Sequence, residues 1–119
     1  MQLKLIVLRT PDQKALVEFY TLLGMVFEYH KHGNSPYHYS AHIGETVLEI
    51  YPINKTQTAP DKDLRLGFTI DNFDDALSQI EKLSYKVLAQ PSNTEWGYMA
   101  IVQDPDGRKI ELYKNHSPE

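Results

Sequence analysis

The chain has 119 residues, 41% of them hydrophobic and 24% charged, which is typical of a globular domain and excludes collagen-like, low-complexity and mostly disordered classes. It contains no cysteine, so disulfides and thiol nucleophiles are excluded, and a reducing compartment is favoured. Its net charge of −4 disfavours a nucleic-acid partner. The first apolar run is too short for a signal peptide or membrane span, so we expect a cytoplasmic protein with no membrane partner.

The first half of the chain predicts one strand, one helix and three further strands. Residues 3–8 are apolar and rich in branched side chains, which predicts a strand buried on both faces. Thr10 is placed to cap the following helix, with Pro11 at its first position and Gln13 completing a capping box. Apolar residues at helical spacing continue the helix to Gly24. The further strands are predicted at residues 26–32, 37–43 and 46–51, with turns between them.

The second half repeats the same order of elements. Residues 53–62 show no hydrophobic periodicity and predict a linker. A helix with an apolar face is predicted between Phe73 and Leu83. The remaining predictions are strands at residues 64–70, 85–89, 96–103 and 108–113, a polar loop at 90–95 and a plain turn at 104–107.

The two halves also repeat in sequence. Shifts of 61 and 62 residues place the helix and the last strand of the first half on those of the second: Ala15, Leu16 and Leu22 fall on Ala76, Leu77 and Leu83, and residues 48–51 fall on 110–113. The sequence therefore predicts an α+β fold with two βαβββ modules. Module one covers residues 1–52 and module two 63–114, within a single domain of residues 1–119. One helix covers only one face of each sheet, so the other face is expected to line a cavity.

Three segments carry a family resemblance. They read EFYTLLGM at residues 18–25, TVLEIY at 46–51 and QDPDGRKIEL at 103–112. Together they resemble the vicinal oxygen chelate superfamily, which includes glyoxalase I, bleomycin-resistance proteins and extradiol dioxygenases. The Trp96-Gly97 pair is similar to that of small members. The resemblance implies the glyoxalase/bleomycin-resistance fold, in which eight strands form a mixed, partly closed sheet around a cavity, and it implies a homodimer.

The resemblance also implies where a metal would bind. Enzymes of this superfamily hold a divalent metal with ligands from the first and last strand of each module. The last-strand positions correspond to Glu49 and Glu111, but the first-strand positions fall on Leu5 and Arg65, which cannot ligate a metal. Two carboxylates are a poor site for a transition metal, and an arginine adds a fixed positive charge. We therefore predict no metal and no other cofactor, with Glu49 and Glu111 as the fallback ligands and the candidate catalytic residues.

Strand alternation places both glutamates on the cavity side of their sheets. Glu49 and Glu111 are then expected to face one cavity, with Arg65 within reach of at least one of them. They are expected to form an internal salt bridge, or to bind a polar or cationic ligand, or to act as a general base. Trp96 is expected at the mouth of the pocket, because an amphipathic ring suits such an edge. The predicted ligand-binding residues are Glu49, Arg65, Trp96, Glu111, Tyr113 and His42.

Four of the five histidines lie between residues 30 and 42. In the simplest hairpin register His30 pairs with Tyr39 and His32 with Tyr37, so His38 and His42 face the other side. This arrangement predicts a solvated hairpin and not a four-ligand metal site. The functional alternative is that His38 or His42 contacts the ligand.

The leading functional hypothesis is a metal-degenerate protein that binds a small organic molecule, a class that includes sequestration proteins of the bleomycin-resistance type. One alternative is a metal-dependent lyase, isomerase or dioxygenase that uses Glu49 and Glu111 with a further ligand such as His42. Another is a non-catalytic regulatory or interaction module. Metal content separates the enzyme from the others, and retention of an organic ligand separates the first from the third. Whether the protein turns over a substrate stays open.

Overall fold

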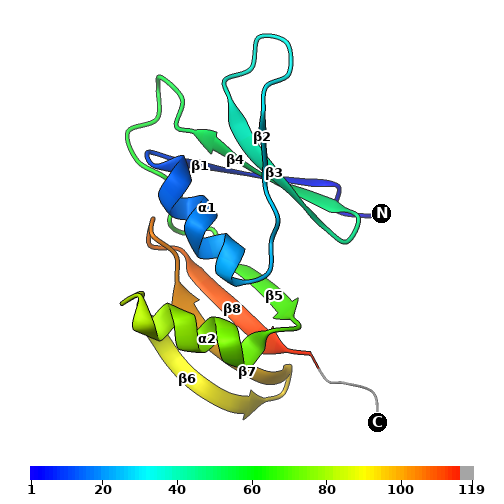
Figure 1. The fold of residues 1–119 in the computed structure, drawn as a ribbon, viewed down its shortest axis with the longest axis vertical. Coiled ribbons are helices and arrows are strands. Elements are labelled where there is room, and N and C mark those ends of the chain that lie inside the picture. Colours follow the sequence, from blue (N-terminus) through cyan, green and yellow to red (C-terminus); the bar gives the residue numbers. More distant parts are fainter. Residues whose placement is uncertain (116–119) are drawn as a thin grey trace. The chain divides into compact units, whose positions relative to one another are not determined.

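The computed structural model describes residues 1–115 and divides the chain into two compact units, residues 1–21 with 25–61 and residues 22–24 with those from 62 onward. Strands and helices follow the order βαβββ twice (Figure 1), which confirms the predicted α+β fold of two modules. The eight strands form two four-stranded sheets, and over the described residues neither sheet closes into a barrel. Between residues 1 and 115, no helix is long and apolar enough to span a membrane.

The first unit has one buried and one uncovered sheet face. Its elements are β1 (Leu5–Thr10), α1 (Gln13–Leu22), β2 (Glu28–His30), β3 (His38–Ile43) and β4 (Thr46–Pro52). The strand order is β1-β4-β3-β2, with β1 parallel to β4 and the other pairs antiparallel. Side chains that alternate toward one face form the core and are at most 1% exposed: Leu8, Ala41, Leu48 and Ile50.

The prediction that the first strand is buried on both faces is wrong. Leu5 and Val7, which point away from the core, are 50% and 37% exposed, whereas Leu8 is 1% exposed. The reason is topological, because β1 is an edge strand and only one face of its sheet is covered. An apolar surface therefore stays accessible beside Glu49, which is paired with Val7.

The start of α1 also differs from the prediction. The helix begins at Gln13, so Asp12 and not Thr10 occupies the capping position. An oxygen of the Asp12 carboxylate accepts a hydrogen bond from the backbone N–H of Ala15 at 3.1 Å, as an N-cap side chain does. Thr10 is the last residue of β1, and its hydroxyl oxygen accepts a hydrogen bond from the N–H of Asp12. The helix cap therefore lies two residues later than predicted.

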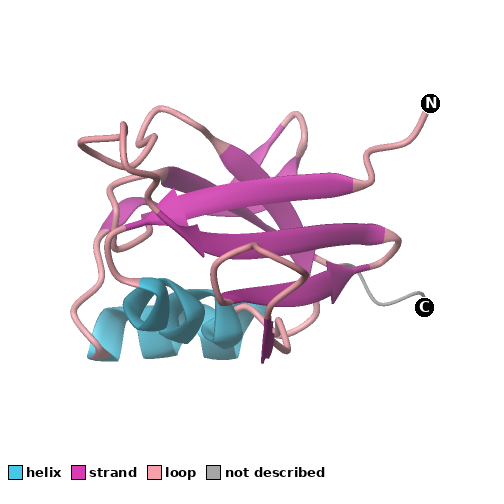
Figure 2. Cartoon of the chain, turned by 90° about the horizontal axis from the view of Figure 1, so that it is seen from above, coloured by secondary structure: helices cyan, strands magenta, loops and turns pink. Residues whose placement is uncertain are grey.

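The second unit repeats the architecture. Its elements are β5 (Leu66–Ile70), α2 (Phe73–Lys82), β6 (Val87–Thr94), β7 (Gly97–Gln103) and β8 (Lys109–Lys114), in the sheet order β5-β8-β7-β6. The ring of Phe73 in α2 lies 5.7 Å from that of Tyr98 in β7, so α2 covers the Tyr98 face of the sheet. Figure 2 shows helices and strands in separate colours. The fully buried strand residues of this face are Ala100, Val102, Ile110 and Leu112.

The predicted polar loop at residues 90–95 is wrong, because β6 continues through it to Thr94. The strand tolerates Pro91 because it is the edge strand of its sheet, where a missing N–H does not interrupt a ladder. Its pairing with β7 shifts register twice, between Val87 and Ala89 and between Ala89 and Ser92. A polar, proline-containing segment therefore forms an irregular edge strand.

The turn between β7 and β8 holds a buried ionic group that the sequence pattern did not reveal. Arg108 is 1% exposed, and its Nη1 lies 3.2 Å from a carboxylate oxygen of Asp104 and 2.9 Å from one of Asp106. Asp104 also accepts hydrogen bonds from the backbone N–H groups of Asp106 and Arg108. The residues that were expected to form a plain turn therefore hold buried ion pairs in the second unit.

Candidate functional site

A connected polar group lies on the uncovered face of the second sheet. Arg65, just before β5, donates a hydrogen bond from Nε to an oxygen of Glu111 at 2.6 Å. The hydroxyl of Tyr113 donates to the other oxygen of the same carboxylate. The side chain of Arg65 is 47% exposed and that of Glu111 is 23% exposed. The carboxylate is therefore held between a cation and a phenol and remains open to solvent.

The contacts between these groups change their proton affinities. The hydrogen bond from Tyr113 is the main cause that holds the pKa of Glu111 below its ordinary value of 4.5; burial opposes this shift, and the hydrogen bond and charge of Arg65 reinforce it. The same hydrogen bond to Glu111 is the main cause that raises the pKa of Tyr113 above its ordinary value of 10.0. At neutral pH this group therefore presents a carboxylate, a guanidinium and a neutral phenol.

Two glycines lie beside the Tyr113 ring. A Cβ placed on Gly67 would lie 3.5 Å from this ring, and one placed on Gly97 would lie 3.7 Å from it. Gly97 has a φ of +132°, a conformation that side chains rarely adopt. Trp96 directly precedes Gly97 and is 74% exposed. The only tryptophan of the chain therefore directly precedes a glycine that lies near the Tyr113 ring.

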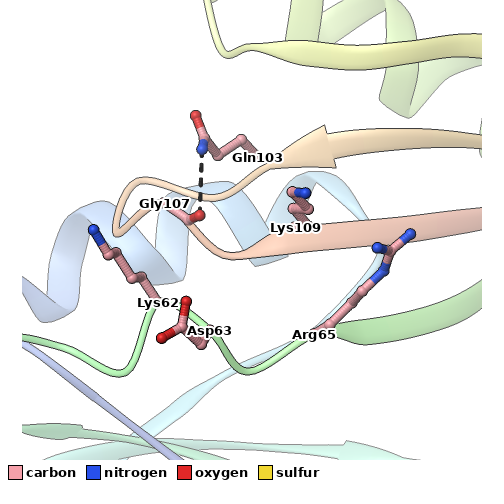
Figure 3. Close-up of a pocket in the computed structure, with 6 residues that line it drawn as sticks. All are labelled: Lys62, Asp63, Arg65, Gln103, Gly107 and Lys109. Atoms are coloured by element: carbon pink, nitrogen blue, oxygen red, sulfur yellow. Dashed lines mark hydrogen bonds between the residues drawn. The ribbon is translucent and has the colours of Figure 1, made fainter.

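A pocket of about 410 Å³ opens in the same unit and includes Arg65. Figure 3 shows Lys62, Asp63 and Arg65 on the segment leading into β5, and the β7–β8 hairpin opposite them. The other lining residues are Gln103, Gly107 and Lys109, and the amide of Gln103 donates to the carbonyl oxygen of Gly107 at 3.2 Å. Three cationic side chains against one carboxylate favour a ligand with an anionic or strongly polar group.

The predicted site residues of the first unit lie on its uncovered sheet face. Glu49 is in register with Ser40 of β3 and Val7 of β1, and its side chain is 15% exposed. His42 lies on the same face, two residues after Ser40 and opposite Val47, and is exposed. Glu49 and His42 are therefore on one surface, but the residue that contacts Glu49 is His38.

The predicted register of the histidine hairpin is wrong by one residue. His30 pairs with His38, and Tyr29 pairs with Tyr39, because the connection between the strands is longer than a simple turn at residues 33–36. A one-residue slip in register moves a side chain to the opposite face. The structure therefore gathers histidines that the simplest register had separated.

The result is a compact cluster of four potential metal ligands. One ligand atom from each residue lies within 4.8 Å of the others, in a group formed by His30, His32, His38 and Glu49. The three imidazole rings have centroids 4.5 to 5.4 Å apart. The density of histidine between residues 30 and 42 was the available sequence signal. The simplest hairpin register, however, places these residues on different faces of the sheet.

Comparison with known families and structures places these features in context. The profile of the Glyoxalase/Bleomycin resistance protein/Dioxygenase superfamily matches residues 2–112. Comparison with curated proteins finds no significant match.

Several solved structures share the fold over nearly the whole chain. TnmS3, an antibiotic binding protein from Streptomyces sp. CB03234, is 24% identical, with 98% of this chain and 97% of that chain covered and a TM-score of 0.76. A glyoxalase/bleomycin resistance protein from the same source is 25% identical, with 94% and 99% covered and a TM-score of 0.71. The oxidase ChaP-H2 is 18% identical, with 100% and 97% covered and a TM-score of 0.78.

Proposed function

Because this chain belongs to the glyoxalase/bleomycin resistance protein/dioxygenase superfamily, we propose that it binds a small amphipathic organic molecule. The observation that carries this proposal is the pocket of about 410 Å³ beside the Arg65–Glu111–Tyr113 group. Its volume lies in the range of small-molecule sites, and its polar lining suits the charged or polar end of such a molecule. The antibiotic binding protein with the same fold supports this class of function.

In this proposal each polar residue of the second unit has a distinct part. Arg65 binds an anionic or carbonyl group of the ligand, and Glu111 accepts hydrogen bonds or pairs with a cationic group. The phenol of Tyr113 and the exposed indole of Trp96 offer flat surfaces for an aromatic portion. Glu49 and His42 are proposed ligand contacts on the sheet of the first unit.

Fluorescence of the single tryptophan tests the proposal. Untagged protein is titrated with a panel of planar aromatic and zwitterionic compounds, and equilibrium dialysis confirms each change in emission. Trp96→Ala, which removes the fluorophore and is measured by dialysis alone, is expected to weaken binding by about 1–3 kcal/mol, because a stacked aromatic ring often dominates a contact surface. Glu111→Gln is expected to weaken compounds that carry a cation and to spare neutral ones.

Leu83→Ala is the matched control, because Leu83 is also a large exposed side chain, 56% exposed, but lies at the end of α2. It is expected to leave every affinity unchanged. Binders whose affinity is untouched by Trp96→Ala, Glu111→Gln and Glu49→Gln would show that the site lies elsewhere. A panel with no binder at all would contradict the proposed function.

A further inference from the structure

We propose that His30, His32, His38 and Glu49 bind one divalent transition-metal ion on the uncovered face of the first sheet. All four residues belong to the first unit, and Glu49 is the one residue that this site shares with the proposed contacts of the organic ligand. Three imidazole nitrogens and one carboxylate oxygen suit zinc, cobalt and similar borderline cations. They do not suit magnesium or calcium, which prefer oxygen ligands alone.

The strand register creates the site. His30 and His38 are directly opposed on β2 and β3, and Ser40 and Glu49 are directly opposed on β3 and β4. Alternation along β3 places His38 and Ser40 on the same face, so three neighbouring strands direct His30, His38 and Glu49 to one surface. His32 follows β2 and brings its ring to 4.5 Å from that of His30.

The spacing of two of the ligand atoms matches metal coordination. The Nε2 of His38 lies 3.2 Å from an oxygen of Glu49, and two ligands of a tetrahedral ion at usual bond lengths are about 3.3 Å apart. The four ligand atoms lie within 4.8 Å of one another, so small side-chain rotations bring the outer ones into range. The backbone of the sheet does not need to move.

His38 supplies a second, independent observation. Its side chain is fully buried, and its Nδ1 is 3.0 Å from the carbonyl oxygen of Pro36. A carbonyl only accepts, so Nδ1 carries the proton, and in the neutral ring Nε2 has a free lone pair. Nε2 makes no hydrogen bond, since its contact with Glu49 lacks hydrogen-bond geometry. His38 Nε2 is thus a buried nitrogen without a hydrogen-bond partner beside a carboxylate, and a metal ion bound by both groups would satisfy it.

Neighbouring groups hold the imidazole of His30 and the backbone of His32. The Nε2 of His30 shares a hydrogen bond with the hydroxyl of Ser40 at 2.9 Å. The backbone N–H of His32 donates to the hydroxyl of Ser35, and its carbonyl oxygen accepts from the N–H of Ser35. His38 is further held by stacking on Tyr51, with ring centroids 4.2 Å apart. Metal-binding histidines are usually held by such outer contacts, which fix the ring and its tautomer.

The site differs from the one that the family resemblance implies. At the first-strand positions, Leu5 offers no ligand atom and the guanidinium of Arg65 is bound to Glu111, so those residues do not fit a metal. The cluster shares only Glu49 with that pattern. Its imidazoles come from β2, β3 and the loop after β2, which replaces ligands from the first strand and from the second unit.

Cobalt titration of untagged, chelator-treated protein tests the proposal. We expect one Co²⁺ per chain, with the visible absorption of a low-symmetry, nitrogen-ligated ion, displacement by Zn²⁺ but not Mg²⁺, and a higher melting temperature on binding. His38→Asn and Glu49→Gln are each expected to lower affinity at least 100-fold. Ser40→Ala is expected to lower it about 10-fold, because it removes only the group that orients His30.

Glu45→Gln is the matched control, because it removes the same charge from an exposed position in the β3–β4 turn and is expected to leave affinity unchanged. Circular dichroism of each metal-free variant confirms that it is folded. Unchanged cobalt affinity in folded His38→Asn overturns the proposal, as does binding lost in Glu111→Gln but kept in Glu49→Gln. The absence of any saturable binding to the unmodified chain overturns it as well. Organic ligand binding measured through Trp96 is a separate readout, and His38→Asn is expected to leave it unchanged whether or not cobalt binding is lost.

Discussion

The hydroxyl of Tyr113 donates a hydrogen bond to Glu111, two residues earlier on β8, while Arg65 occupies the other carboxylate oxygen. The protonation state of each residue therefore affects the pKa of the other. The pKa of Glu111 is held below 4.5 and that of Tyr113 is raised above 10.0. Their interaction is intact through the neutral range and is lost toward both extremes of pH.

The pH dependence of stability follows from these directions. A carboxyl whose folded-state pKa is lowered stabilises the fold above its unfolded pKa, and this contribution disappears as pH falls through the folded value. A phenol whose folded-state pKa is raised contributes below its unfolded pKa, and this contribution disappears as pH rises through the folded value. Tyr113→Phe is therefore expected to raise the pKa of Glu111 and to remove the alkaline component. Carboxyl NMR titration and urea unfolding across pH measure the two effects.

Tyr37→Phe is the control for this experiment, because Tyr37 is 54% exposed and belongs to the first unit. It is expected to leave the pKa of Glu111 unchanged. An unaltered Glu111 titration in Tyr113→Phe would show that the hydrogen bond is not formed in solution.

Loss of Arg65 is expected to cost little stability. A buried pair would lose about 3–5 kcal/mol when one partner is removed, but the Arg65 side chain is 47% exposed. Water screens such a pair, so Arg65→Ala is expected to lower the free energy of unfolding by less than about 1 kcal/mol. Denaturant unfolding measures the change. A loss above 3 kcal/mol would mean that this pair is buried in solution.

Loss of Arg108 is expected to cost far more. Arg108→Met leaves the carboxylates of Asp104 and Asp106 without the cation that lies 3.2 and 2.9 Å from them, and the expected loss is about 3–5 kcal/mol. Lys109→Met changes the same charge at an exposed neighbour and is expected to stay within about 0.5 kcal/mol. Equal effects of the two substitutions in urea unfolding would contradict the structural role of Arg108.

Association of two chains is a prediction from the family resemblance and from the exposed apolar side chains of the first unit. Leu3, Leu5 and Val26 are 59%, 50% and 81% exposed, and association would remove such surface from water. Sedimentation equilibrium at tens of micromolar is expected to give twice the chain mass of 13.7 kDa. A mass of 13.7 kDa under those conditions would count against a homodimer.

Hydrophobic periodicity was sufficient to predict the two modules, because both helices and most strands bury one regular face. Pairs such as Leu48 and Ile50 in β4 are fully buried, as the alternation required. Periodicity was insufficient for β6, whose pairing is irregular and whose composition is polar. It also missed the cap at Asp12, because Thr10 and Asp12 are both suitable capping residues and only the end of β1 decides between them.

For the candidate sites too, one part was predictable from the sequence and another part was not. Proximity of Arg65 to Glu111 followed from the repeat and from alternation along β8. The histidine cluster did not follow, because it depends on a single step of register between β2 and β3. Gly33, with a φ of +54°, and the hydrogen bonds of Ser35 shape a connection that no alternation rule describes. Burial of Arg108 was likewise invisible, since its partners lie two and four residues away in an ordinary turn sequence.

The irregular β6 bears on how this protein behaves at high concentration. An exposed sheet edge invites another strand to add to it, and this is a common route to aggregation. In β6, Pro91 offers no N–H and two register shifts interrupt the regular row of hydrogen-bonding groups. That edge of the second unit is therefore a poor template for intermolecular β-sheet growth. Replacing Pro91 with a β-branched residue would be expected to shorten the time that concentrated protein remains in solution.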